Sequence, residues 1–292
     1  MKILVIGGTG FIGSQVVRQL AAAGHRVTVH HRGDHEPELP SSVRHVHDKR
    51  AEIPVRHFPA ELSSEDWDAI IHMIAMGEND ARAAVDAFRG RTGRAVWVSS
   101  GDVYLAYGRF TGFDPGPIQP GLLKEDSPRR TKLYPYREQA KSPNDLPYYY
   151  DKILVEDIAC DASDLPATIL RLPKVYGPEK NSDLATVFRY RNHPDWRWTH
   201  GYVENVSAAI VLTAVHPNAS GKTYNVGEEQ APTIAERIAN LPHSSLAADE
   251  ESSFHFDQDI AYDTTRIRIE LGYRELVPEP AAMGATLMGK AK

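Results

Sequence analysis

The first thirteen residues constrain the fold more than any other part of the chain. An apolar run at 3–6 leads directly into glycines at positions 7, 8, 10 and 13, and a segment with helical periodicity follows, opened by Phe11 and Ile12. A strand, a glycine-rich turn and a helix in this order predict a dinucleotide site. Gly7 permits the tight turn, Gly10 lets a diphosphate approach the backbone, and Gly13 lets the helix pack closely on the strand. The free N–H groups at the start of the helix favour the diphosphate.

Strand-like and helix-like segments alternate along the first 175 residues, which predicts a doubly wound parallel sheet. The expected strands are 3–6, 26–30, 43–47, 69–74, 95–98 and 167–172, and the expected helices include 81–88 and 147–159. We therefore expect an α/β protein with a Rossmann-type sheet over residues 1–175, to which 202–227 return. A small C-terminal substrate-binding lobe is expected from 176–201 and 228–292. Residues 105–147, rich in proline and without clear periodicity, are interpreted as an excursion on the substrate side.

Composition narrows the class of protein. The 292 residues are 41% hydrophobic and 25% charged, as in ordinary soluble domains. A net charge of −6 argues against a nucleic-acid partner. The single cysteine, Cys160, excludes a disulfide framework and is interpreted as a small core residue. Because no apolar run is as long as a membrane span, we expect a cytoplasmic protein with no membrane partner.

Two segments carry residues suited to proton transfer. Ser99 and Ser100 end a predicted strand, at the sheet edge where open α/β proteins build their sites. Tyr148 and Lys152 are four residues apart, which predicts that they share one face of a helix. A neighbouring ammonium favours tyrosinate, so Tyr148 would exchange a proton with a substrate oxygen that Ser100 holds by a hydrogen bond.

Histidines recur in the first fifty residues, at positions 25, 30, 31, 35, 45 and 47. They fall on separate predicted strands and loops, and none shows the compact spacing of helical metal ligands. We therefore expect no metal site. Farther along the chain, Trp196, Arg197 and Trp198 have two interpretations, as the lining of an aromatic pocket or as packing.

Together these residues resemble the extended short-chain dehydrogenase/reductase family, in its NAD-dependent epimerase/dehydratase group. The similarity extends along most of the chain and includes Gly7-x-x-Gly10-x-x-Gly13, Ser99-Ser100-Gly101-Asp102-Val103-Tyr104, Glu125-Asp126-Ser127-Pro128, Tyr148-x-x-x-Lys152, Arg171-Leu172-Pro173, Tyr202-Val203-Glu204-Asn205-Val206 and Tyr224-Asn225-Val226-Gly227.

The resemblance implies roles for individual residues. Ser100 matches the catalytic serine or threonine, Tyr148 the acid/base, and Lys152 the lysine that binds the ribose and lowers the tyrosine pKa. Asp48, after the third strand, matches a residue that contacts the adenine. The cofactor-binding residues so implied are Gly7, Gly10, Phe11, Ile12, Gly13, His31, Arg32, Asp48, Ile74, Lys152 and Pro173.

The chain also departs from the family pattern. Members that use NAD usually carry an acid at the end of the second strand, whereas this chain has His31 followed by Arg32. A cationic side chain suits a 2′-phosphate, so we expect NADP(H), with NAD as the alternative. Lys174 and Trp198 stand where members acting on nucleotide sugars often have asparagine and arginine, which argues against a nucleotide-sugar substrate.

Three functions remain open at this point. We favour an NAD(P)-dependent oxidoreductase that transfers a hydride at a C–O centre of a small carbonyl, alcohol or sugar-like substrate. The first alternative is a sugar or nucleotide-sugar epimerase or dehydratase that retains its NAD. The second is a non-catalytic dinucleotide-binding protein, regulatory or RNA-binding, on the same fold. A homodimer is a family expectation.

Overall fold

The computed structural model describes residues 1–49 and 53–289. They form two compact units, which the chain visits in turn. The first unit comprises Met1–Ser100, Leu133–Arg171 and Ser207–Tyr224, and the second comprises Gly101–Lys132, Leu172–Val206 and Asn225–Lys292. Residues 101–132, which we expected within the dinucleotide domain, therefore belong to the second unit.

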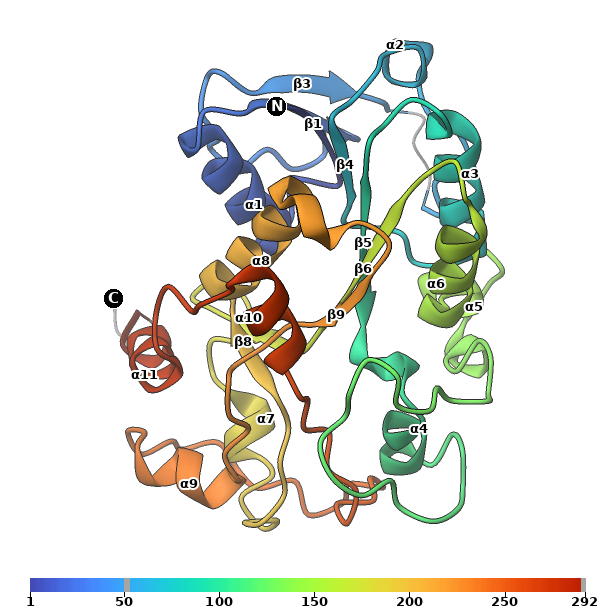
Figure 1. Ribbon diagram of the computed structural model, residues 1–292. Helices are drawn as coiled ribbons and strands as arrows, with labels where there is room; N and C mark the ends of the chain where they lie inside the picture. The colour runs from blue at the N-terminus through green and yellow to red at the C-terminus, as the bar shows by residue number, and fades with distance from the viewer. Residues whose placement is uncertain (50–52, 290–292) are drawn as a thin grey trace. The chain divides into compact units, whose positions relative to one another are not determined.

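A seven-stranded sheet organises the first unit (Figure 1). Its strands lie in the order β3-β2-β1-β4-β5-β6-β9, and the pairs β3–β2, β2–β1, β1–β4 and β4–β5 are parallel. The strands are β1 (Lys2–Ile6), β2 (Arg26–His31), β3 (Arg44–His47), β4 (Ala69–His72), β5 (Ala95–Ser100), β6 (Ala167–Leu172) and β9 (Thr223–Asn225). The predicted Rossmann-type α/β fold is confirmed.

Helices cover both faces of this sheet, with α1 on one side and α3 and α6 on the other (Figure 1). The helices of this part of the chain are α1 (Phe11–Ala22), α2 (Ala60–Ser63), α3 (Glu78–Phe88), α5 (Leu146–Tyr149), α6 (Lys152–Asp161) and α8 (Val203–Val215). Large apolar side chains such as Phe88, Trp97 and Ile169 fill the layer under α3 and α6. A strand covered on both faces is buried on both faces, and residues 3–6 of the central strand β1 are accordingly all apolar and buried.

The second unit contains a short parallel pair, β7 (Lys174–Tyr176) with β8 (His200–Tyr202). Its helices are α4 (Leu105–Thr111), α7 (Ala185–Phe188), α9 (Ile234–Ala239), α10 (Thr265–Leu271) and α11 (Glu279–Gly289). Trp196 is buried, stacks on Phe110 at a centroid distance of 4.9 Å, and donates its Nε1–H to Gln258 O. Of the two interpretations of this tryptophan, packing is the observed one.

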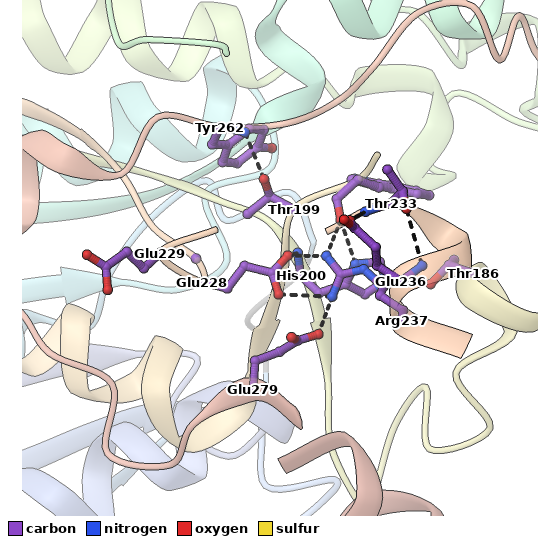
Figure 2. A network of polar contacts seen from close by, with 12 residues as sticks. Thr186, Thr199, His200, Glu228, Glu229, Thr233, Glu236, Arg237, Tyr262 and Glu279 are labelled. Atoms are coloured by element: carbon purple, nitrogen blue, oxygen red, sulfur yellow. Dashed lines mark hydrogen bonds and ion pairs between the residues drawn. The ribbon is translucent and has the colours of Figure 1, made fainter. Parts of the chain in front are cut away.

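A buried ion cluster holds the second unit together around Arg237 (Figure 2). The guanidinium donates to both carboxylate oxygens of Glu228, to Glu279 and to Trp198 O. Burial raises the pKa of the Glu228 carboxyl to about 8, against the opposing effect of Arg237. Thr233 and Glu236 form a capping box that starts α9 and so positions Arg237.

Several local expectations are wrong. The continuous helix expected at 147–159 is two helices, α5 and α6, separated at Tyr150 and Asp151. The segment expected to be irregular, 105–147, begins with α4. Cys160 is exposed, not in the core. Among the described residues, no helix is both long and apolar enough to span a membrane.

Candidate active site

The turn between β1 and α1 has the geometry that close approach of a ligand requires. Gly7 has φ +80°, and a Cβ on Gly13 would lie 2.6 Å from Gly7 O, inside van der Waals contact. A Cβ on Gly10, in contrast, would meet no atom within 4 Å. Gly10 caps α1 without a side chain, so the first turn of the helix opens toward free space. This arrangement fits a dinucleotide diphosphate.

A cavity of about 210 Å³ lies at this turn, within the first unit. Five of the predicted cofactor-binding residues line it, namely Gly7, Gly10, His31, Arg32 and Ile74. Thr9, His30, Ile53 and Val55 line it too, and the sequence analysis missed them. Thr9 lies inside the glycine motif and could have been found there, whereas Ile53 and Val55 lie on an irregular segment without a recognisable signal. Phe11, Ile12 and Gly13 form the first turn of α1 beside the cavity.

The carboxyl ends of β2 and β3 bring further predicted residues together. Asp48 is buried, and its backbone N–H donates to His31 O at 2.9 Å. Arg32 is half exposed and pairs with Asp34, with Nε and Oδ2 3.3 Å apart. Because an exposed ion pair of this kind contributes little free energy, another anion can replace Asp34 as the partner of Arg32.

Asp80 fixes the segment on the other side of the cavity. Its carboxylate accepts hydrogen bonds from the backbone N–H groups of Val55 (2.6 Å), Met76 (3.1 Å) and Gly77 (3.0 Å). Burial raises the pKa of this carboxyl, and the three N–H donors oppose that shift. The side chain thus joins the start of α3 to the cavity wall at Val55.

Lys152 is buried at the first position of α6. Its Nζ donates to Ala75 O at 2.6 Å and to Val98 O at 2.9 Å, which places the ammonium between the ends of β4 and β5. The positive charge adds to burial in lowering the pKa of His72 to about 3, so this histidine is neutral at physiological pH.

The two serines at the end of β5 have different surroundings. Ser99 is buried and donates to Glu156 Oε1 at 2.6 Å, and Glu156 forms a buried ion pair with Arg171 at 2.7 Å. Ser100, the last residue of β5, is only partly buried. Of the two serines, Ser100 is therefore the more exposed.

Tyr148 does not share a helix with Lys152, contrary to our expectation. Asp151 is the cause, since its side chain caps α6 by accepting from Ile153 N at 3.0 Å and also accepts from Tyr134 N at 2.6 Å. Tyr148 lies on the separate turn α5 and is 37% exposed. Arg137 lies against its ring, 4.7 Å from the centroid, and donates to Tyr148 O at 2.8 Å.

Tyr150, in the break, is a neighbour of Lys152. The Lys152 Nζ lies 6.0 Å from the centroid of its ring. Tyr149 is buried, which raises the pKa of its hydroxyl to about 12.

Pro173, the remaining predicted cofactor contact, belongs to the second unit, where it packs close to Gly201.

Sequence comparison identifies the first part of the chain. Residues 3–90 match the sequence model of the NAD dependent epimerase/dehydratase family. The match covers less than a third of the chain, which is similar to that family over this segment. The match agrees with the resemblance seen in the sequence motifs, and it covers the glycine turn, the three histidine-bearing strands β2, β3 and β4, and Asp80. The prediction of an NAD(P)-dependent enzyme agrees with it.

A curated relative and several solved structures extend the comparison. The 2'-dehydrokanamycin reductase of Streptomyces kanamyceticus is 37% identical over 100 residues, which are 34% of this chain and 28% of that protein's length. Pal from Bacillus thuringiensis is 16% identical with a TM-score of 0.71, covering all of both chains. The dTDP-glucose 4,6-dehydratase of Bacillus anthracis, solved with NAD, is 17% identical with a TM-score of 0.70, over 100% of this chain and 96% of that one. At these identities the structures share the fold.

Proposed function

We propose that this protein is an NAD(P)-dependent oxidoreductase that acts on a C–O centre of a small carbonyl, alcohol or sugar-like substrate. The open space at Gly10, in the cavity that also contains His31, Arg32 and Ile74, is the observation that carries the proposal. The N–H groups at the start of α1 would hold the diphosphate, and Lys152 the ribose. When bound, the nicotinamide supplies or accepts the hydride.

The residues of this chain handle the proton and the orientation of the substrate. Ser100 would donate a hydrogen bond to the reacting oxygen, and Tyr148 would exchange a proton with it. The assignment of Tyr148 rests on the resemblance of Tyr148-x-x-x-Lys152 to the family motif, since the two residues lie on separate helices. Tyr150 is the second candidate, because the Lys152 ammonium lies 6.0 Å from its ring centroid.

NADP(H) is the cofactor that we propose, with NAD as the alternative. Arg32 lines the cavity, and its exposed partner Asp34 can be displaced by a 2′-phosphate. The relative named as a reductase favours a freely exchanging cofactor over an epimerase-like cycle with retained NAD. The dehydratase solved with NAD shares the fold and represents that alternative.

Calorimetric titration with NADPH and NADH tests the cofactor, after the purified protein has been checked by absorbance for bound nucleotide. We expect no retained nucleotide and tighter binding of NADPH. Arg32→Ala should weaken NADPH binding more than NADH binding, and equal losses would refute the preference. Retained NAD(H) would support the epimerase or dehydratase alternative.

Two matched variants test the acid/base. Tyr148→Phe should lower kcat about 10²–10⁴-fold with cofactor affinity preserved, whereas Tyr150→Phe should not. The reverse result would assign the proton to Tyr150. If both variants keep full activity in a screen of carbonyl substrates, neither tyrosine is the acid/base. A wild-type protein that binds cofactor without turnover would favour the non-catalytic alternative.

A further inference from the structure

Three imidazoles and a carboxylate gather at the carboxyl ends of β2 and β3. In the parallel pairing of these strands, His31 lies opposite His47. His45 is two residues before His47 and so projects from the same face of the sheet. Glu36 reaches them from the loop after β2. One potential ligand atom from each residue lies within 4.8 Å of all the others. Our expectation that these histidines stay apart is therefore wrong.

The four side chains are already in contact. His31 Nε2 and His45 Nδ1 are 3.0 Å apart, and His47 Nε2 is 2.5 Å from Glu36 Oε1. The rings of His31 and His47 meet edge to face, with centroids 4.5 Å apart. His31 is buried, and its Nδ1 has no hydrogen-bond partner within the described residues. Polar groups in this state are costly unless a ligand or another partner offsets the burial.

The charges in the cluster favour a cation over an anion. His31 is buried beside the rings of His45 and His47, and each imidazole in its neutral form offers a nitrogen lone pair to a metal ion. Glu36 brings a carboxylate to the same space, with its Oε1 2.5 Å from His47 Nε2. A phosphate placed here would meet that negative charge, whereas a metal ion would meet neutral imidazole nitrogens and a carboxylate oxygen.

We propose that His31, Glu36, His45 and His47 form a binding site for a divalent transition-metal ion such as Zn²⁺. Three imidazole nitrogens with one carboxylate oxygen are a ligand set that Zn²⁺ takes in tetrahedral geometry. Bonds of about 2.0–2.1 Å would place the ligand atoms roughly 3.3 Å apart. The ligand atoms now lie within 4.8 Å of one another, and the side chains of Glu36 and His47 are about half exposed and have room to move.

The site is independent of the proposed enzymatic function, although His31 also lines the cavity at the glycine turn. Binding of a metal is therefore tested by metal alone, and neither NADPH nor a substrate is needed. A failure of this proposal leaves the proposed function untouched, and a failure of that function leaves this site untouched.

The test uses the chain without a histidine tag, stripped with a chelator and dialysed. Calorimetric titration with ZnCl₂ should give one ion per chain, and CoCl₂ should give the strong visible absorption of tetrahedral Co²⁺. The double variant His45→Ala/His47→Ala should weaken Zn²⁺ binding at least about 100-fold, since two of four ligands are lost. His243→Ala, an exposed histidine outside the cluster, is the matched control and should bind like the wild type.

Thermal melting in EDTA checks that each variant is folded. If the double variant is not, Glu36→Gln replaces it, because Glu36 lies exposed on a loop, and it should weaken Zn²⁺ binding about tenfold or more. The proposal is overturned if no stoichiometric binding occurs, or if the cluster variants bind Zn²⁺ as well as the wild type does. Inorganic phosphate binding that depends on His45 and His47, without Zn²⁺ binding, would also overturn it in favour of an anion site.

Discussion

Gly10 and Gly13 make a matched pair of positions for testing whether the β1–α1 turn receives a diphosphate. Both lie in the same motif, and both can be changed to alanine. A Cβ on Gly13 would lie 2.6 Å from Gly7 O and 2.9 Å from Gly8 Cα, both backbone atoms of the strand end. A Cβ on Gly10 would meet nothing within 4 Å, and its φ of −81° is open to any residue. The two substitutions should therefore act on different properties.

The expected magnitudes follow from these contacts. Gly13→Ala must push helix α1 away from β1, and overpacking of this kind costs about 1–3 kcal/mol of unfolding free energy. Gly10→Ala replaces an acceptable N-cap residue by a poor one without a steric clash, and it should cost about 0.5–1 kcal/mol of unfolding free energy. If the diphosphate contacts Gly10, the new methyl group should cost about 1–3 kcal/mol of binding, or roughly a 5–150-fold rise in Kd.

Urea denaturation and calorimetric titration with NADPH measure the two effects separately. The expected pattern is a stable Gly10→Ala protein that binds cofactor weakly, and a Gly13→Ala protein that has lost stability. Gly24→Ala, at an open position after α1 whose φ of +78° strains alanine, should lose stability but keep its NADPH affinity, and it controls for indirect effects of destabilisation. Unchanged NADPH affinity in a folded Gly10→Ala protein would refute the placement of the diphosphate.

Three further predictions concern the supports of the site. His72 has a pKa of about 3 in the folded protein against 6.5 for the free side chain, so below pH 6.5 only the unfolded chain takes up the proton. The free energy of unfolding should therefore drop by about 1.4 kcal/mol per pH unit because of this group. In urea titrations, His72→Phe should lose about 2 kcal/mol less than the wild type does between pH 7 and pH 5. Equal losses in the two proteins would contradict this assignment. Asp80→Ala should lower the free energy of unfolding by about 3 kcal/mol, because three backbone N–H groups lose their acceptor. A loss below about 1 kcal/mol in urea titration would show that water replaces the carboxylate. Glu156→Gln should lower the free energy of unfolding by about 3–5 kcal/mol, because the buried Arg171 loses the charge of its ion-pair partner. The double variant Glu156→Gln/Arg171→Met should recover part of that loss, and if it is no more stable than Glu156→Gln, the ion pair is not the cause.

The sheet and the glycine turn could be predicted because their signals are local. Each buried strand is a short apolar run, and the turn repeats glycine at positions where the backbone needs it. The family match over 3–90 supports the same part of the chain. The break in the predicted helix at Tyr150 does have a local sequence signal, the N-cap residue of the second helix. Asp151 precedes the apolar run of Ile153 and Val155 and is a good N-cap residue, and its side chain accepts from Ile153 N in the structure.

The histidine cluster could not be predicted from spacing alone. His31 and His47 are sixteen positions apart, and only the register between β2 and β3 makes them neighbours. Short elements such as β7 and β8 were also missed, since three residues are too few for a periodic pattern. Likewise, Val55 reaches the cavity through its hydrogen bond to Asp80, a contact between residues twenty-five positions apart that no local pattern reveals.

The helix break at Tyr150 and Asp151 places the two residues proposed for proton transfer and ribose binding, Tyr148 and Lys152, on separate elements. Lys152 is anchored by α6 and the ends of two strands, whereas the tyrosine at 148 is mounted on a short independent turn. We therefore expect that exchanges in residues 137–148, which exclude Tyr134 and its hydrogen bond to Asp151, reposition the tyrosine with little effect on the lysine. Such a division would let related chains acquire different substrates through changes in one loop, while Lys152, which we propose binds the ribose, stays in place. For the same reason, grafting that loop between relatives is a direct route to engineering new specificities.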